Sequence, residues 1–163
     1  MVQQMHGPMI PPSTDEVRQL WLERSLYTVL CRYARGCDER DWASLSQVFT
    51  PDCTADYGRW HCRSREDIVA MVRQHLDGCG PTQHLLGNME VQPLGQGWRT
   101  RTYVRAAHRG AGSLKALRYD AVGQYADDWV CTPEGWRIAY RQMSMTLEIG
   151  DRSVLRSEAL GAA

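Results

Sequence analysis

Apolar residues recur along this chain in two rhythms, and the change from one to the other comes near Pro81. Before it they recur every three or four positions, which predicts helices with one buried face. The first helix is expected to begin after Ser13, which forms a capping box with Glu16, and to end at Gly36, with Asp38 just beyond. Its apolar stripe comprises Val17, Leu20, Trp21, Tyr27, Leu30, Cys31, Ala34 and Cys37, with Tyr33 at its border.

Two shorter helices follow in this first half. Asp41 can cap the segment WASLSQVF, and Ser64 with Asp67 can cap the segment REDIVAMVRQHLD. Between them, CTADYG and RWHC are typical of two short strands that form a hairpin about Gly58. The first half therefore predicts three helices and one small hairpin.

In the second half, polar and apolar residues alternate, which is typical of β-strands. Within the segment 83–90 the residues on one face are His84, Leu86, Asn88 and Glu90. In the segment 98–109, arginines fill most of one face. The other face, which runs from Trp98 to His108, is therefore expected to point inward.

Two more alternating segments, 114–130 and 136–149, complete four strands after the helices. Helices gathered before strands indicate an α+β fold. We expect the helices to cover one face of a strongly curved antiparallel sheet, which makes a cone-shaped α+β barrel around a small-molecule pocket. Residues 1–12 are expected to form a flexible arm, residues 13–149 one domain, and residues 150–163 a tail outside the core.

The charge composition and the lack of long apolar runs exclude two classes of partner, nucleic acids and membranes. The 19 acidic and 19 basic residues balance, which argues against the concentrated basic surface of a nucleic-acid binder. No apolar run approaches membrane-spanning length and the N-terminal residues lack a signal-peptide core, so a cytoplasmic protein without membrane contact is expected. The six cysteines include no CxxC pair and are expected to be free thiols rather than zinc ligands.

His84 is the first candidate for chemistry. It stands early in its strand, so it should lie near one end of the sheet. An imidazole there, beside Leu85 and Leu86, is either a hydrogen-bonded core histidine or a catalytic base.

Three segments carry a family resemblance: CRYARGCDERDWASLSQVFTPDCTADYG, TQHLLGN and TPEGWRIAYRQM. They resemble the SnoaL-like, nuclear-transport-factor-two-like superfamily, and within it the branch that contains scytalone dehydratase and the bacterial bile-acid dehydratase. The resemblance spans roughly residues 17–147. It implies the cone-shaped fold, whereas it is less specific for the reaction, because this fold hosts dehydratases, isomerases, cyclases, dehydrochlorinases and non-catalytic binders.

The resemblance also implies roles for five side chains. Tyr33 and Asp38 match a tyrosine of the first helix and the aspartate that follows it, and His84 matches the base in the HxxGN strand of the second segment. His108 falls where scytalone dehydratase has a second histidine and the bile-acid enzyme has an aspartate. Arg141 matches an arginine on the final strand.

These residue types suit the dehydration of a β-hydroxy carbonyl compound, which needs a base, a donor to the carbonyl oxygen and an acid for the leaving hydroxyl. His84 can be the base, and Asp38 can accept its other ring N–H. Tyr33 and His108 are candidate donors to the carbonyl or leaving oxygen. Arg141 could neutralise an enolate or pair with Asp38, although alternation places it on a surface or an interface. The reaction requires no metal and no organic cofactor.

The expected substrate is a mid-sized, largely apolar ring system such as a polyketide or steroid. Tyr57 resembles a substrate-facing tyrosine of the family. The full set of expected substrate contacts is Tyr57, Asn88, Trp42, Met71 and Trp98, with Met143 as a further apolar candidate. The arginine-rich outer face with Tyr103 favours a homo-oligomer, a dimer or a trimer.

Two other functions are compatible with the sequence. One is an isomerase or polyketide cyclase in which Asp56 or Asp38 shuttles the proton, because ketosteroid isomerase is similar in the placement of its base carboxylate. The other is a non-catalytic binding protein, in which the polar groups of the pocket are satisfied within the protein.

Overall fold

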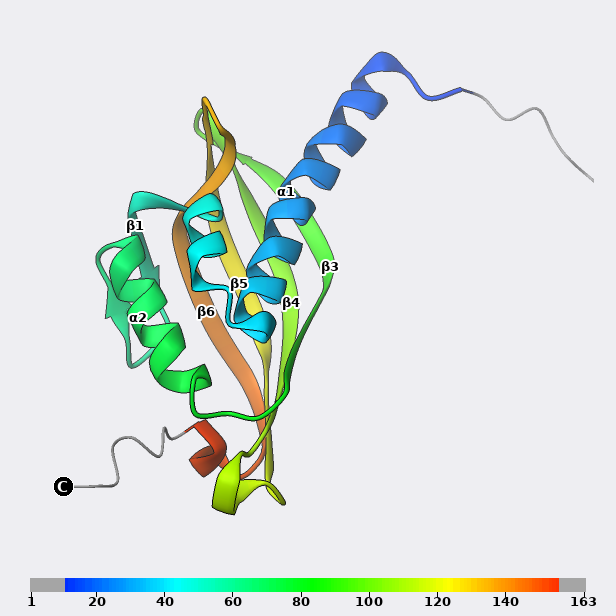
Figure 1. The fold of residues 1–163 in the computed structure, drawn as a ribbon. Helices are drawn as coiled ribbons and strands as arrows, with labels where there is room; N and C mark the ends of the chain where they lie inside the picture. Colours follow the sequence, from blue (N-terminus) through cyan, green and yellow to red (C-terminus); the bar gives the residue numbers. More distant parts are fainter. Residues whose placement is uncertain (1–10, 156–163) are drawn as a thin grey trace, which may run out of the picture.

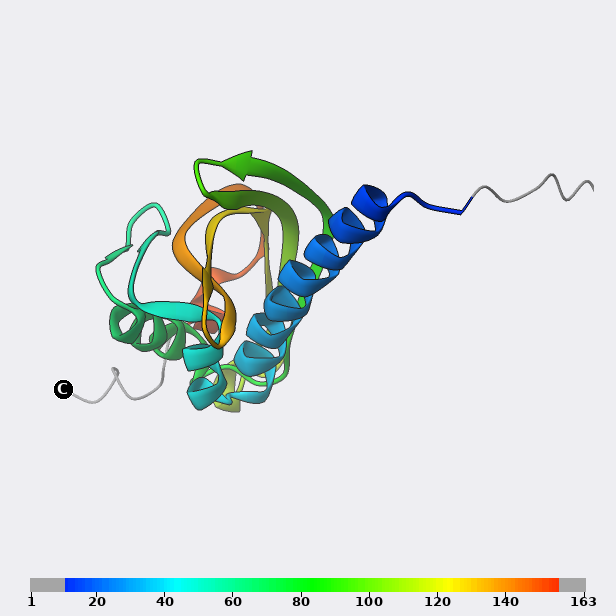
Figure 2. The ribbon, with the colours of Figure 1, turned by 90° about the horizontal axis from the view of Figure 1, so that it is seen from above.

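A curved six-stranded sheet forms the body of the protein, and its helices lie across the open side of the curve (Figures 1 and 2). The computed structural model describes residues 11–155. The first half contains α1 (Thr14–Glu39), the 3-10 helix η1 (Trp42–Gln47), β1 (Phe49–Asp56), β2 (His61–Cys62) and α2 (Arg65–Leu76). The second half contains β3 (Thr82–Leu94), β4 (Gly97–Arg109), η2 (Gly112–Leu114), β5 (Arg118–Thr132), β6 (Gly135–Gly150) and η3 (Arg152–Leu155).

The strands are arranged in the order β2-β1-β6-β5-β4-β3, and the sheet stays open between its edges β2 and β3. The predicted α+β cone is confirmed. The sheet is mixed, however, so the prediction that all of its strands are antiparallel is wrong. β1 runs parallel to β6, since it enters the sheet beside the last strand rather than beside the strands that follow it in sequence.

The first helix begins as predicted and ends later. The Ser13–Glu16 capping box is present, but α1 continues through Gly36 to Glu39 and stops where Arg40 adopts a left-handed conformation with φ 60°. Gly36 is needed for close packing rather than for termination: a Cβ added there would lie 2.6 Å from Ser44 Oγ in η1. Asp38 therefore lies on the last turn of the helix.

The N-terminal half of α1 departs from the predicted buried stripe. Val17, Leu20 and Trp21 are 49%, 60% and 67% exposed, because α1 extends past the edge of the sheet, as Figure 1 shows. The buried stripe begins only at Leu22 and continues to Cys37. Helical periodicity identifies which face is apolar, but it does not show how far the opposing sheet reaches.

Two of the bulges in the sheet change which of the residues selected from the sequence face inward. In β3 the pairing with β4 shifts between Gly87 and Glu90; Asn88 has φ 49° and is exposed. The expectation that Asn88 and Glu90 share the face of His84 is therefore wrong. In β6, Ala139 is skipped between the pairs formed by Ile138 and Tyr140, so that Ile138 and Arg141 are both buried.

The packed part of the chain continues to Leu155. Val154 in η3 is buried, and its carbonyl accepts a hydrogen bond from Cys79 Sγ at 3.3 Å. Six residues that were expected in the tail, 150–155, therefore belong to the end of β6, to η3 and to the link between them. The rest of that tail, residues 156–163, and residues 1–10 of the predicted arm lie outside the described residues. All six cysteines are free thiols, and no helix between residues 11 and 155 has the length and apolar character needed to cross a membrane.

Candidate active site

A buried His–Asp pair joins the end of α1 to the start of β3. His84 Nδ1 lies 2.7 Å from Asp38 Oδ1, and the backbone N–H of His84 donates to Asp38 Oδ2 at 2.8 Å. The two side chains are only 6% and 20% exposed. Because a carboxylate only accepts, Nδ1 carries a ring hydrogen, and in the neutral ring Nε2 is the atom with the lone pair. The structure thus brings together two residues that are 46 positions apart in the sequence.

The surroundings of Asp38 keep its carboxylate ionised. Burial opposes ionisation, but hydrogen bonds from the ring and backbone of His84, together with one from Thr82, lower the pKa of the Asp38 carboxyl below its ordinary value. Thr82 Oγ1 donates to Asp38 Oδ1 at 3.0 Å. Thr82 did not emerge from the sequence, because a threonine at the start of a strand is a common strand residue.

The His84 side chain lines a cavity of about 120 Å³ between the inner face of the sheet, α1 and α2. Its exposed lining residues, Trp60, Met145 and Arg152, mark where it meets solvent. Of the residues selected from the sequence, those that line the cavity are Tyr33, Tyr57, Met71, His84, His108 and Met143. Those that do not are Asp38, Arg141, Trp42, Asn88 and Trp98.

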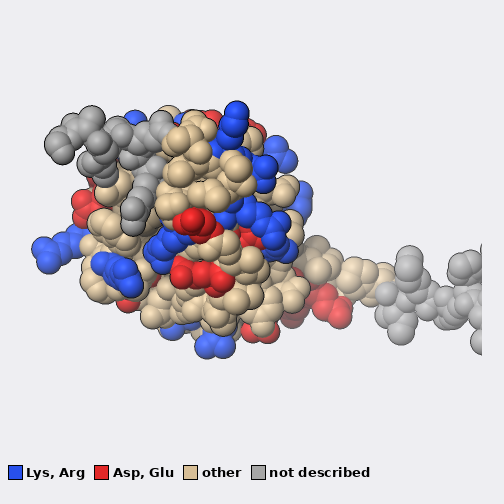
Figure 3. All heavy atoms as spheres, turned by 90° about the horizontal axis from the view of Figure 1, so that it is seen from below, with Lys and Arg blue, Asp and Glu red and all other residues tan. Residues whose placement is uncertain are grey.

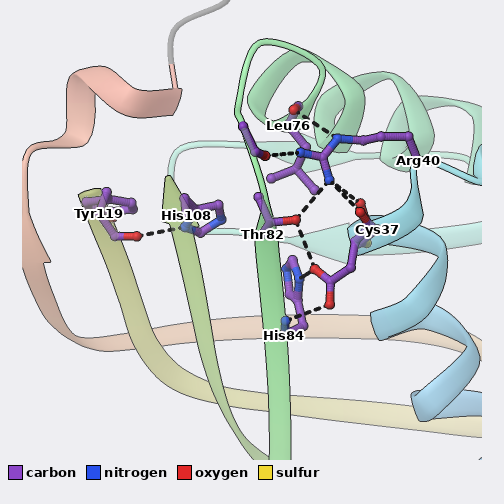
Figure 4. A network of polar contacts seen from close by, with 9 residues as sticks. Cys37, Arg40, Leu76, Thr82, His84, His108 and Tyr119 are labelled. Carbon is purple, nitrogen blue, oxygen red and sulfur yellow. Dashed lines mark hydrogen bonds and ion pairs between the residues drawn. The ribbon is translucent and has the colours of Figure 1, made fainter. Parts of the chain in front are cut away.

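His108 on β4 uses its one ring hydrogen within the protein, so its free ring nitrogen is an acceptor rather than the expected donor. Its Nδ1 lies 3.0 Å from the carbonyl oxygen of Tyr119, and Figure 4 shows this bond beside the strand that carries His84. A carbonyl only accepts, so Nδ1 donates and Nε2 keeps a lone pair. Burial lowers the pKa of His108 to about 4, so the ring is neutral near pH 7. The ring centres of His108 and His84 are 6.0 Å apart.

Arg141 is inside the protein but does not reach the cavity. Its guanidinium donates twice to Asp127 on β5, at 2.7 and 2.9 Å, and both side chains are fully buried. It also stacks over the rings of Tyr33 and Tyr125 at 4.3 and 4.0 Å. The expected surface or interface position is wrong because of the bulge at Ala139, and the ion-pair partner is Asp127 rather than Asp38. A carboxylate on the apolar face of β5 was the available sequence signal for this pair.

Tyr57 and Tyr33 offer hydroxyl groups at the deep side of the cavity. The Tyr57 hydroxyl is buried near Tyr33 and Arg141 without a well-aligned hydrogen bond to any described residue. Burial raises the pKa of Tyr57 to about 12 and that of Tyr33 well above its ordinary value. Both phenols therefore remain protonated and can donate.

The remaining sequence candidates lie elsewhere. Asp56 accepts a hydrogen bond from the Gly58 N–H at 2.7 Å and lies 3.5 Å from His61 Nδ1, in the turn between β1 and β2. Asn88 borders a depression on the outer face of the sheet. Trp42 and Trp98 are partly buried against the core. None of these four side chains lines the cavity.

Other kinds of site find little support in the part of the chain that is described. No group of three or more His, Cys, Asp or Glu residues within 11–155 is placed to hold a metal ion. On the end of the molecule where η2 and η3 lie, basic and acidic side chains are interspersed among uncharged surface (Figure 3). This face therefore lacks the continuous basic surface that nucleic-acid binding requires.

The family described as SnoaL-like domain matches residues 18–142. An uncharacterized protein of Mycobacterium tuberculosis is 31% identical over 120 residues, which cover 69% of this chain and 78% of that protein.

Two solved structures share the fold at low sequence identity. A provisionally named scytalone dehydratase from Novosphingobium aromaticivorans aligns with a TM-score of 0.75 at 19% identity, over 83% of this chain and 91% of its own. The hexachlorocyclohexane dehydrochlorinase LinA-type3 from Novosphingobium barchaimii aligns with a TM-score of 0.71 at 11% identity, over 83% of this chain and 94% of its own.

Proposed function

Because this chain belongs to the SnoaL-like domain family, as its sequence resemblance predicted, we propose that it is a cofactor-independent lyase, a dehydratase that removes water from a hydroxylated cyclic carbonyl compound. The observation that carries the proposal is the His84–Asp38 pair, in which Asp38 holds the ring of His84 against the cavity. An ionised carboxylate on Nδ1 leaves Nε2 as a base toward the cavity and stabilises the imidazolium once it forms.

The reaction can proceed with His84 as both base and acid. Nε2 takes the proton from the carbon beside the substrate carbonyl, while the Tyr57 hydroxyl donates to the carbonyl oxygen, where negative charge develops. One well-placed donor of this kind contributes roughly 3–4 kcal/mol. The C–O bond to the neighbouring carbon then breaks as the C=C bond forms. The imidazolium returns its proton to the departing hydroxyl, which leaves as water.

His108 favours a substrate with a hydroxyl group. A neutral imidazole that offers only its Nε2 lone pair binds a donor, such as the O–H of the substrate before elimination. An isomerase would use the same base without needing a hydroxyl on its substrate. The acceptor beside His84 is the feature that supports dehydration over isomerisation.

The cavity favours a small substrate. An apolar cavity of roughly 150 Å³ binds benzene, so the space of about 120 Å³ here suits one ring. We therefore propose a single-ring hydroxy ketone in place of the polyketide or steroid expected from the sequence. The alternative that relies on Asp56 loses support, because the carboxylate of Asp56 is engaged in a turn outside the cavity.

The test uses 3-hydroxycyclohexanone, whose dehydration to cyclohexenone is followed by the absorbance of the enone. His84→Gln is expected to lower kcat/KM by about 10²–10⁴-fold, the usual contribution of a positioned general base. Asp56→Asn is the matched control and is expected to leave the rate unchanged. Turnover that survives His84→Gln, or that is lost in Asp56→Asn instead, would exclude the proposed mechanism.

A further inference from the structure

We propose that Arg40 and Thr82 are positioning residues for the base: together they hold the Asp38 carboxylate in the one orientation that directs His84 Nε2 toward the cavity. This inference rests on the proposed role of His84, and it adds two residues that touch neither the cavity nor a substrate. Neither residue lines the cavity. Both act through Asp38.

Arg40 lies at the junction of α1, α2 and β3 (Figure 4). Its guanidinium has no carboxylate partner among residues 11–155, and all of its hydrogen bonds go to neutral oxygens. These acceptors are the carbonyls of Leu76 at 3.1 Å, Cys37 at 2.6 Å, Asp38 at 3.2 Å and Gly80 at 3.1 Å, and Thr82 Oγ1 at 2.8 Å. A planar guanidinium can serve so many acceptors at once, whereas the single ammonium of lysine cannot.

The bond from Arg40 decides the direction of the next bond. Arg40 Nη1 can only donate, so Thr82 Oγ1 accepts from it. The single hydrogen of the Thr82 hydroxyl is then directed to Asp38 Oδ1, 3.0 Å away. The relay therefore runs one way, from the guanidinium through the hydroxyl to the carboxylate.

The carboxylate consequently has three donors at fixed positions. Asp38 Oδ1 accepts from Thr82 and from His84 Nδ1, and Oδ2 accepts from the His84 backbone N–H. Without the Thr82 hydroxyl, the carboxylate loses one of the donors that resist its rotation about χ2. The Asp38 side chain is 20% exposed, so the carboxylate then has a direction in which to turn. Arg35 and Glu39 of α1 border the same groove as Asp38 and His84. If the carboxylate of Asp38 turns outward, Arg35 offers it a cationic partner, whereas Glu39 repels it.

The decisive experiment compares Thr82→Val with Thr82→Ser in the full chain, by measuring solvent exchange of the His84 Nδ1 proton by ¹⁵N-edited NMR. Thr82→Val removes the hydroxyl with little change in shape and is expected to speed exchange by about tenfold or more, the factor for one hydrogen bond to a charged group. Thr82→Ser keeps the hydroxyl and is expected to restore slow exchange. Arg40→Lys is expected to exchange as fast as Thr82→Val.

Thr102→Val on β4 is the matched control, because the Thr102 hydroxyl is buried without a hydrogen-bond partner in the described chain; its His84 proton is expected to exchange as in the wild type. Unchanged exchange in Thr82→Val, or fast exchange in Thr82→Ser, would overturn the inference.

Measurements of turnover distinguish a failure of this inference from a failure of the proposed dehydratase reaction. If the exchange pattern holds but 3-hydroxycyclohexanone is not dehydrated, the positioning stands and the reaction fails. If turnover occurs, Thr82→Val should lower kcat with little change in KM.

Discussion

At the scale of single residues, the two histidines of the cavity differ because of their hydrogen-bond partners. His84 faces an ionised carboxylate, which stabilises a positive ring, whereas His108 faces the carbonyl of Tyr119 and another imidazole. The same side chain is therefore the proposed base at one position and a neutral acceptor 6.0 Å away. Residue type alone could not separate the two roles, because the difference comes from the partners of Nδ1.

The neutral state of His108 predicts a loss of stability in mild acid. Its pKa is lowered from 6.5 to about 4, so between these two values the unfolded chain binds a proton that the folded chain does not. The free energy of unfolding should therefore fall as the pH drops from about 6.5 to 4, by up to roughly 3 kcal/mol from this residue. Urea unfolding at pH 7 and pH 5 measures the change, and His108→Gln should flatten it.

The comparison uses the slope with pH rather than the absolute stability, because His108→Gln also alters packing in the core. His61→Gln is a suitable control, since that ring is exposed. The carboxyl of Asp38 has a pKa below its ordinary value of 3.8, so its own contribution is lost only at lower pH. An equally steep pH dependence in His108→Gln would contradict the neutral assignment.

At the scale of helices and strands, Gly36 links the first helix to the segment that follows it. A Cβ at this position would lie 2.6 Å from Ser44 Oγ and 3.3 Å from the Asp41 carbonyl oxygen. Gly36→Ala improves helix propensity by about 1 kcal/mol, but it displaces a hydroxyl that donates to Asp41 at 2.8 Å. We expect a net loss of about 1–2 kcal/mol in the free energy of unfolding, measured by urea denaturation.

A double variant tests whether the expected loss of stability comes from crowding between a Cβ at position 36 and the Ser44 hydroxyl. Ser44→Ala removes the crowded oxygen, so Gly36→Ala combined with Ser44→Ala should cost less than the sum of the two single changes. Gly87→Ala serves as the control, because a Cβ there meets no atom within 4 Å. Strict additivity of the two changes would show that Ser44 is not the obstacle.

The same elements show how far the sequence predicts this fold and site. The capping box at Ser13 placed the start of the first helix, and the alternation after Pro81 placed the four long strands, because both are local signals. The ends are less well predicted, since α1 continues to Glu39 and β5 begins at Arg118 rather than at residue 114. The family resemblance selected Asp38 and His84, and the structure places them in contact. What alternation cannot reveal is an inserted residue. The bulges at Asn88 and Ala139 therefore reversed the predicted faces of Asn88 and Arg141.

The two proposed positioning residues carry no local sequence signal. An arginine directly after a helix, such as Arg40, is usually a solvated charge, and Thr82 is an ordinary residue for a strand. Their importance depends on α1, α2 and β3 meeting at one point, which is a property of the tertiary structure.

At the scale of the whole molecule, the outer face of the sheet is unusually apolar for a surface next to an arginine row. Leu85, Tyr103 and Leu147 are 65%, 59% and 52% exposed, and the first two border one depression on that face. Two of the neighbouring arginines are already neutralised within the sheet, Arg99 by Asp128 and Arg105 by Asp120. The face therefore combines exposed apolar groups with paired charges, which is typical of a surface between subunits.

We expect this face to join identical chains, so that the protein is a dimer or trimer in solution. Tyr103→Glu places an unpaired charge at the centre of the apolar group and should convert the oligomer to monomers, because an uncompensated charge is costly to bury at an interface. Sedimentation equilibrium measures the molar mass, and Gln47→Glu, an exposed change on η1, is the control with the same added charge. A wild-type protein that sediments at 18.6 kDa, the mass of one chain, would contradict the expectation. So would an oligomer that persists in both Tyr103→Glu and Leu85→Glu, because the subunits would then have to meet through another surface, such as the exposed N-terminal half of α1.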